Sequence, residues 1–242
     1  MKRLHMPLID MRYWLGITLA SIFGTNLGDL YAHELHLGIY LGTAILAVLA
    51  AAAFLAEWRD GKPREFYYWL VIIIIRTGAT NIADYLAFRV RVTQLPLSLA
   101  LAAIIGVFGW LAARADTLNS DDTVDLPPTG PAYWTAMLGA GVFGTVVGDV
   151  CSHFVGEGVA SLGLDALLAI ALLVWAKTPV RSFAIYWATV AIARTAGTAM
   201  GDWLAESKTT NIGLPLSTLL TGVTFVAVLA LWRTGKSSPA VR

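Results

Sequence analysis

The chain has 242 residues, of which 57% are hydrophobic and 14% are charged, and its formal net charge is +1. Soluble domains average about 45–50% apolar and about 25% charged residues, so this composition excludes an ordinary soluble protein and indicates an integral membrane protein. The net charge gives no indication of a nucleic-acid partner. The single cysteine, Cys151, excludes an intramolecular disulfide and a cysteine-rich metal site.

Eight apolar segments have the length that a hydrocarbon core of about 30 Å requires. They predict spanning helices at 13–32, 37–56, 66–88, 94–113, 131–152, 159–176, 182–204 and 213–232. The first of them contains a copy of the repeat described next, so we do not expect it to be a cleaved signal peptide. The expected fold class is all-α and integral to the membrane, with eight transmembrane helices.

One sequence pattern occurs four times. Each copy begins with Tyr-Trp, and a Thr and an Asp follow eleven and fifteen residues after the Trp. The pairs are Tyr13-Trp14, Tyr68-Trp69, Tyr133-Trp134 and Tyr186-Trp187; the threonines are Thr25, Thr80, Thr145 and Thr198; the acids are Asp29, Asp84, Asp149 and Asp202. This recurrence indicates an internal repeat of two helices per unit.

The repeats are grouped into two halves. A shift of 120 residues places Asp29 on Asp149, and a shift of 118 places Arg76 on Arg194. We therefore expect a first membrane half at 1–113, a cytoplasmic linker at 114–130 and a second membrane half at 131–242. Because each unit has two helices, all four units point the same way, which predicts two parallel pseudo-symmetric halves.

The loop charges predict the orientation. Most loop lysines and arginines lie on the side of the two termini, and only Arg89, Arg91 and Lys208 lie on the other. By the positive-inside rule both termini are then cytoplasmic. The Tyr-Trp pairs are expected at the cytoplasmic membrane interface, where amphipathic rings anchor helix ends.

The four repeat aspartates are the principal candidate site. Fifteen residues of helix place each of them about 22 Å beyond its Trp, all at one level. A carboxylate inside a membrane is costly unless it faces the bundle interior or a wet cavity. Small residues four apart precede each acid, as in Gly144 and Gly148, and such pairs allow close helix packing. We expect Asp29, Asp84, Asp149 and Asp202 to bind a cation, together with Thr25 and Thr145.

A metal site is a second candidate. Asp29 with His33, and Asp149 with His153, are pairs four residues apart that lie on one helix face. Carboxylate and imidazole ligands suit divalent transition metals. The alternative is that both histidines are interfacial residues that hydrogen-bond the acid or loop carbonyls.

Two arginines lie inside the predicted helices, eight residues before their acids. Arg76 and Arg194 are expected to be counter-charges for the aspartates. Either they form buried ion pairs that hold two units together, or they shift when a cation or proton binds.

The clearest repeat, IYWATVAIARTAGTAMGDWLAE followed by LPLSTLL, and the third copy, YWTAMLGAGVFGTVVGDV, resemble a family of bacterial membrane proteins with four tandem two-helix repeats of unknown function. Its members are often labelled uncharacterised membrane-anchored proteins. The resemblance covers essentially the whole chain and implies an eight-helix, multi-pass protein of the bacterial inner membrane. It implies no reaction and no substrate.

The leading functional hypothesis is a secondary transporter of a cation, with a divalent metal favoured and protons as the coupling ion. The expected partners are the lipid bilayer and a small cation or solute, and a homo-oligomer is compatible with the sequence. No cofactor is expected apart from a transported metal ion. The alternatives are a transporter of a small organic solute, an intramembrane enzyme with a metal-activated water, and a non-catalytic assembly subunit.

Overall fold

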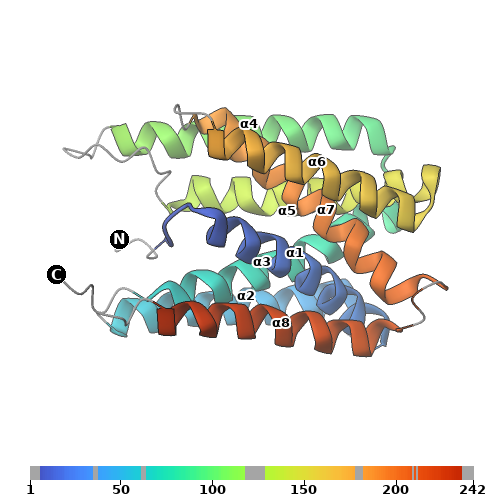
Figure 1. Ribbon diagram of the computed structural model, residues 1–242, viewed down its shortest axis with the longest axis horizontal. Helices are drawn as coiled ribbons and strands as arrows, with labels where there is room; N and C mark the ends of the chain where they lie inside the picture. Colours follow the sequence, from blue (N-terminus) through green and yellow to red (C-terminus); the bar gives the residue numbers. More distant parts are fainter. Residues whose placement is uncertain are drawn as a thin grey trace.

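The protein is described by a computed structural model that covers residues 6–34, 38–60, 64–117, 129–177, 182–208, 210 and 212–235. Within these ranges the regular structure is helical (Figure 1). The helices are α1 (Met11–Asp29), α2 (Gly38–Asp60), α3 (Glu65–Asp84), α4 (Gln94–Thr117), α5 (Pro131–Val155), α6 (Glu157–Lys177), α7 (Phe183–Glu206) and α8 (Leu214–Gly235). Short π-helical turns, η1 (Leu30–Glu34) and η2 (Tyr85–Arg89), continue α1 and α3.

Each expected helical segment is found as a helix, with ends that differ by a few residues. One of these differences affects the predicted linker at 114–130: helix α4 continues into it and ends at Thr117. The stretch 118–128 lies outside the described residues. At the other side of the linker, Pro131 occupies the first turn of α5, a position where its missing N–H is not needed.

Local capping fixes where the helices of the repeat begin and end. The side chain of Asp10 accepts hydrogen bonds from the backbone N–H groups of Arg12 and Tyr13, at 2.9 and 3.0 Å, and so caps α1. Ser182 caps α7 in the same way by accepting from the N–H of Ile185. Gly156 separates α5 from α6 at a φ of +86°, a conformation that favours glycine.

The odd-numbered helices form an inner bundle. Helix α1 packs against α3 and α7, and α5 packs against the same two, so the four helices close a ring. Each even-numbered helix lies outside this ring and packs mainly on the inner helix that follows it: α2 on α3, α4 on α5, α6 on α7, and α8 back on α1. We call the end where α1 begins and α8 ends the terminal end, and the opposite end the far end (Figure 1).

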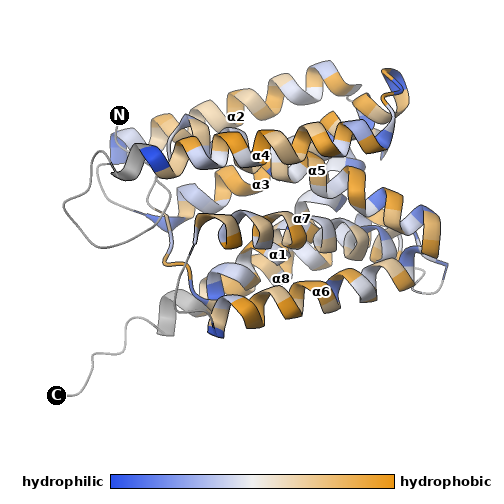
Figure 2. Ribbon diagram, turned by 90° about the horizontal axis from the view of Figure 1, so that it is seen from above, coloured by the Kyte–Doolittle hydropathy of each residue, from blue (hydrophilic) through white to orange (hydrophobic). Residues whose placement is uncertain are grey.

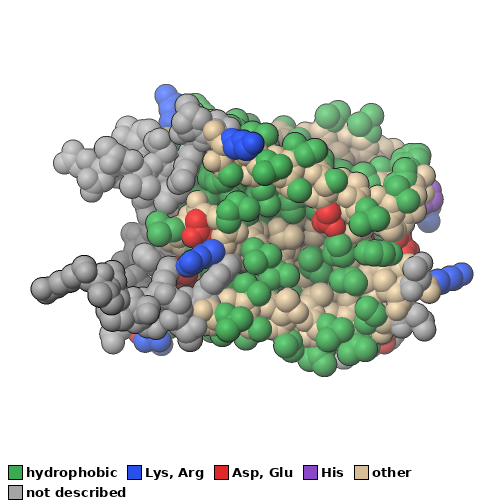
Figure 3. Space-filling view, viewed as in Figure 1, with side chains coloured by type: hydrophobic (Ala, Val, Ile, Leu, Met, Phe, Trp, Pro, Cys, Tyr) green, Lys and Arg blue, Asp and Glu red, His purple; other side chains and the backbone are tan. Residues whose placement is uncertain are grey.

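The chain is a membrane protein. Six of the described helices are long and apolar enough to cross a membrane: α2, α3 with its π-helical turn, α4, α5, α6 and α8. Figure 2 shows the hydrophobic colouring concentrated along the outer helices. In the face shown in Figure 3, hydrophobic side chains cover most of the length and basic side chains lie toward the two ends.

The small residues before each acid allow the inner helices to pack closely, as expected. A Cβ atom added to Gly24 of α1 would lie 2.6 Å from Cγ of Arg76 on α3, and one added to Gly148 of α5 would lie 2.9 Å from Cβ of Thr198 on α7. On α3 the small residues before the acid are Ala79 and Ala83, and they belong to one buried cluster with Val142 and Val146 of α5. The close approach brings polar side chains of neighbouring helices within hydrogen-bonding distance along the bundle axis.

Candidate functional site

The inner bundle carries a stack of five levels that are four residues apart. Because the four helices run in the same direction, equivalent repeat positions meet at the same height on the axis. From the terminal end the levels are Tyr13, Tyr68, Tyr133 and Tyr186; then Ile17, Ile72, Met137 and Val190; then Ser21, Arg76, Gly141 and Arg194; then Thr25, Thr80, Thr145 and Thr198; and finally Asp29, Asp84, Asp149 and Asp202. The first four levels are buried and the aspartates are half-buried.

The four tyrosines form a closed cluster of hydroxyl groups, which we call the tyrosine tetrad. The hydroxyl of Tyr13 lies 2.9 Å from that of Tyr68 and 2.6 Å from that of Tyr186. The hydroxyl of Tyr133 lies 2.6 Å from that of Tyr68 and 3.0 Å from that of Tyr186. Each buried hydroxyl therefore has partners without any water.

The expectation that the Tyr-Trp pairs are interfacial anchors is wrong. Tyr13 and Trp14 are 1% and 0% exposed, and they lie in the core of the bundle. Each Trp packs on the tyrosine of a neighbouring inner helix; the ring centroids of Trp14 and Tyr186 lie 5.7 Å apart, and those of Trp187 and Tyr133 lie 5.5 Å apart. The tyrosines turn inward because four hydroxyl groups at one level can satisfy one another.

The four repeat threonines converge on a single arginine, and we call them the threonine ring. The guanidinium of Arg76 donates to Oγ1 of Thr80 at 3.1 Å and of Thr145 at 2.9 Å. It also donates to Oγ1 of Thr25 and of Thr198, and more weakly, at 3.5 Å, to the carbonyl of Gly141. Sequence reasoning placed Thr25 and Thr145 at the site but missed the other two, although all four share one repeat position.

The buried ion pairs expected for the arginines are not found among the described residues. A salt bridge joins Arg64 and Asp60 at the surface. Arg194 donates to Oγ of Ser21 at 3.1 Å and to the sulfur of Met137 at 3.2 Å. The Nε atoms of Arg76 and Arg194 have no partner. The two guanidinium groups reach in opposite directions along the axis, Arg76 toward the threonines and Arg194 toward the apolar level.

The four aspartates lie at the last level of the axis, one on each inner helix, and we call this set the acid ring. They are within electrostatic range of one another: Asp29 is influenced by the charges of Asp84 and Asp149, and Asp202 by those of Asp149 and Asp29. Glu206 is a further carboxylate in electrostatic range of this ring, and it is exposed. The sequence does contain a signal for it, because Glu206 follows Asp202 by the same four residues that separate each Asp from its His in the odd units.

Of the predicted metal ligands, the structure describes the side chains of Asp29, Asp149 and His153. His153 is exposed at the far end of α5, and the side chain of His33 lies outside the described residues. Within the part of the chain that the structure describes, no three His, Cys, Asp or Glu side chains are placed so that they could hold a metal ion. Asp29 and Asp149 both lie within electrostatic range of Asp84.

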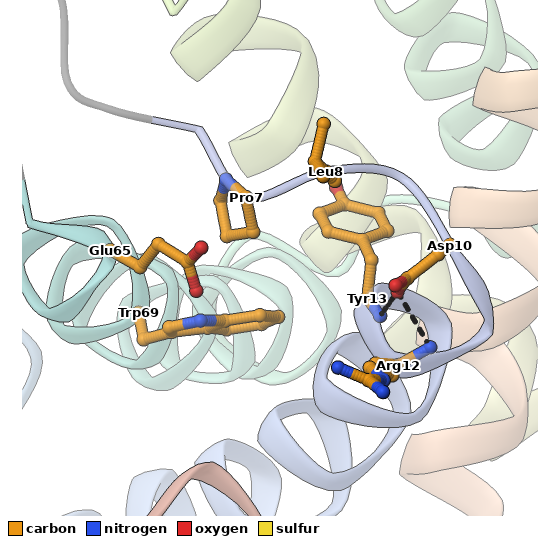
Figure 4. Close-up of a pocket in the computed structure, with 7 residues that line it drawn as sticks. All are labelled: Pro7, Leu8, Asp10, Arg12, Tyr13, Glu65 and Trp69. Atoms are coloured by element: carbon orange, nitrogen blue, oxygen red, sulfur yellow. Dashed lines mark hydrogen bonds between the residues drawn. The ribbon is translucent and has the colours of Figure 1, made fainter. Parts of the chain in front are cut away.

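A small pocket lies at the terminal end, beside the tyrosine tetrad (Figure 4). It is lined by Pro7, Leu8, Asp10, Arg12, Tyr13, Glu65 and Trp69 and has a volume of about 30 Å³. A cavity needs roughly 10–15 Å³ of such volume to hold one water molecule, so the pocket has room for a few waters at most. The pocket brings charged side chains from the starts of α1 and α3 next to a member of the tetrad.

Comparison with known proteins identifies the repeat. Residues 12–62 and 185–236 match the family model described as Repeat of Unknown Function (DUF347), and these segments correspond to α1 with α2 and to α7 with α8. No curated protein and no solved structure matches the chain. The copies at Tyr68 and Tyr133 lie outside the two matched segments but place their side chains at the same levels of the axis. The chain is thus a membrane protein that carries two copies of the repeat that defines a family of unknown function.

Proposed function

We propose that the protein is a secondary transporter that moves a small inorganic cation across the bacterial inner membrane. In this proposal all eight helices span the membrane as four pseudo-symmetric two-helix units, and both termini are cytoplasmic. The observation that carries the proposal is the set of four half-buried carboxylates, one from each inner helix, that lie within electrostatic range of one another at the far end of the axis. Acids inside a membrane segment are costly and mark ion pathways when they face the bundle interior.

The charge of the axis supports a cation. Four aspartates and two arginines leave a formal charge of −2 when the histidines are neutral, because −4 and +2 sum to −2. One divalent cation or two protons would balance it. Oxygen ligands suit hard cations such as Mg²⁺ and Mn²⁺, and Mg²⁺ binds as a partly hydrated ion through few carboxylates. Such an ion needs no preassembled group of three ligands.

Arg76 is the internal counter-charge in this proposal. Its guanidinium lies on the axis directly behind the acid ring, within electrostatic range of Asp29, Asp149 and Asp202. While the guanidinium occupies this place, its positive charge opposes the passage of a free cation along the axis. The apolar level and the tyrosine tetrad fill the axis nearer the terminal end. The bundle is therefore closed to free diffusion, as a coupled transporter requires.

Flux measurement tests the proposal. We expect purified protein in liposomes to accumulate Mn²⁺ or Mg²⁺ when a pH gradient is applied, and Asp149→Asn to reduce the initial rate by about tenfold or more, since one charged ligand is lost. Asp165→Asn is the matched control, because Asp165 belongs to the outer helix α6 and lies outside the acid ring. Equal rates for wild type and Asp149→Asn with every cation tried would refute the proposal.

The other hypotheses have less support in the described residues. An organic solute held by the repeat tyrosines and tryptophans needs a cavity beside them, but the pocket that reaches Tyr13 has a volume of about 30 Å³. A larger pocket of about 480 Å³ lies between α2 and α3, where Tyr40 and Tyr85 line it, and includes none of the repeat aromatic residues. A metal-dependent enzyme needs a metal held by several ligands beside a bound water, and no observation favours that arrangement over the carboxylate ring.

A further inference from the structure

Four hydroxyl groups surround one cationic group at the centre of the bundle. We propose that the threonine ring is a binding site for a monovalent cation, and that the guanidinium of Arg76 occupies it as a tethered substitute for that ion. The inference deepens the transport proposal and rests on it only for the step in which the guanidinium leaves the ring.

The direction of the hydroxyl protons makes the ring a set of acceptors. Each threonine donates its own proton to the carbonyl four residues earlier on its helix: Thr25 to Ser21 at 2.9 Å, Thr198 to Arg194 at 3.2 Å, Thr145 to Gly141 at 3.4 Å and Thr80 to Arg76 at 3.5 Å. The lone pairs of four oxygens, one from each inner helix, are then left to face the axis. A buried ring of four acceptors is complementary to a cation.

All four repeat units contribute to the threonine ring, whereas the arginine that occupies it comes from one unit. Every unit supplies the threonine, but only α3 supplies the arginine that fills the ring. The equivalent residues of the odd units are Ser21 and Gly141. The fourth unit has Arg194 at this position, and its guanidinium binds Ser21 and Met137 instead. Burial of an arginine in this bundle therefore does not require a hydroxyl ring.

Uncharged oxygen ligands favour a monovalent ion. Divalent cations in proteins are usually held by carboxylates, which here lie one turn further along the axis, at the half-buried far end. The two rings then form two adjacent sites of different charge. When no cation is bound at the acid ring, its uncompensated carboxylates attract the guanidinium, and the threonine ring that the guanidinium vacates can accept a monovalent ion such as Na⁺ or K⁺.

Chemical rescue tests the binding site. Arg76→Ala empties the ring, and we expect millimolar guanidinium, Na⁺ or K⁺ chloride to raise its thermal unfolding temperature in a saturable way, with choline chloride as the inactive salt. Wild type, whose ring is filled, should not respond. A further Thr145→Val substitution removes one acceptor and should weaken the apparent affinity by about tenfold, the usual effect of one hydrogen bond.

Arg194→Ala is the matched control, because it removes an equally buried arginine that no hydroxyl ring surrounds. Rescue of Arg76→Ala alone supports the proposal, while rescue of neither variant, or of both to the same extent, overturns it. If Arg76→Ala is not folded when purified in guanidinium, the shorter, uncharged Arg76→Gln is used, and failure of both to bind any of the three cations also overturns it. Rescue is measured without flux, so the site can stand even if Asp149→Asn leaves every flux unchanged.

Discussion

At the scale of single residues, the axis is built from polar side chains that satisfy their equivalents in the other units. A tyrosine hydroxyl or an arginine in the core of a membrane protein has no water to bind, and an unsatisfied polar group there costs several kcal/mol. The tetrad solves this with four hydroxyls at one level, and the threonine ring does so around Arg76. The same residues that look like membrane anchors in the sequence are therefore core residues.

Tyr186→Phe should destabilise the protein, because it keeps the ring but removes a hydroxyl that bonds Tyr13 at 2.6 Å and Tyr133 at 3.0 Å. We expect a loss of about 1–3 kcal/mol in the free energy of unfolding, measured by titration with a denaturing detergent. Tyr40→Phe is the control: it removes a hydroxyl of an exposed pair whose oxygen atoms are 3.5 Å apart, and should have almost no effect. Equal effects would contradict the buried tetrad.

At the scale of helices, small residues decide how closely the inner helices approach. Gly24 lies against the stem of Arg76, and Gly148 against Thr198, so the polar levels and the close contacts depend on each other. Polar residues on their buried faces lower the hydropathy of α1 and α7, which are absent from the six helices that are apolar enough to span a membrane by composition alone. Helix α3 has an equally polar buried face but is among the six, because the apolar run at 70–75 raises its mean hydropathy.

Gly148→Ala should push α5 away from α7, since the added Cβ would lie 2.9 Å from Cβ of Thr198. Overpacking of this kind costs about 1–3 kcal/mol, and we expect a lower thermal unfolding temperature together with reduced cation flux. In the control Gly163→Ala, on α6, no atom lies within 4 Å of the new Cβ. That variant should be as stable as wild type or slightly more stable, because alanine is the better helix former.

At the scale of the whole molecule, the second helix of each unit packs on the first helix of the next unit. Helix α2 covers α3 rather than α1, and α8 closes the circle by covering α1. Asn26 of α1 donates to Oγ of Ser217 on α8 at 2.7 Å, which ties the first unit to the last. The halves of the chain are thus interlocked around the axis and do not form two separate bodies.

The proposed topology can be tested with impermeant thiol reagents on intact cells. In a Cys151→Ser background, Thr93→Cys between α3 and α4 should be labelled from outside, whereas Arg64→Cys before α3 should be labelled only after lysis; both positions are exposed. The reverse pattern would contradict cytoplasmic termini. Labelling of both positions from the same side would show that α3 does not cross the membrane.

The sequence by itself determined the helices, the repeat and the acids. Apolar length and composition are local properties, so they identified the helical segments, and the spacing from Trp to Asp identified the four aspartates of the ring. Only the tertiary structure decided the partners. Whether Tyr13 faces lipid or three other tyrosines, and whether Arg76 binds a carboxylate or four threonines, depends on which helices are neighbours and on their relative height. These are relations between segments up to 173 residues apart, as for Tyr13 and Tyr186, and no local pattern encodes them.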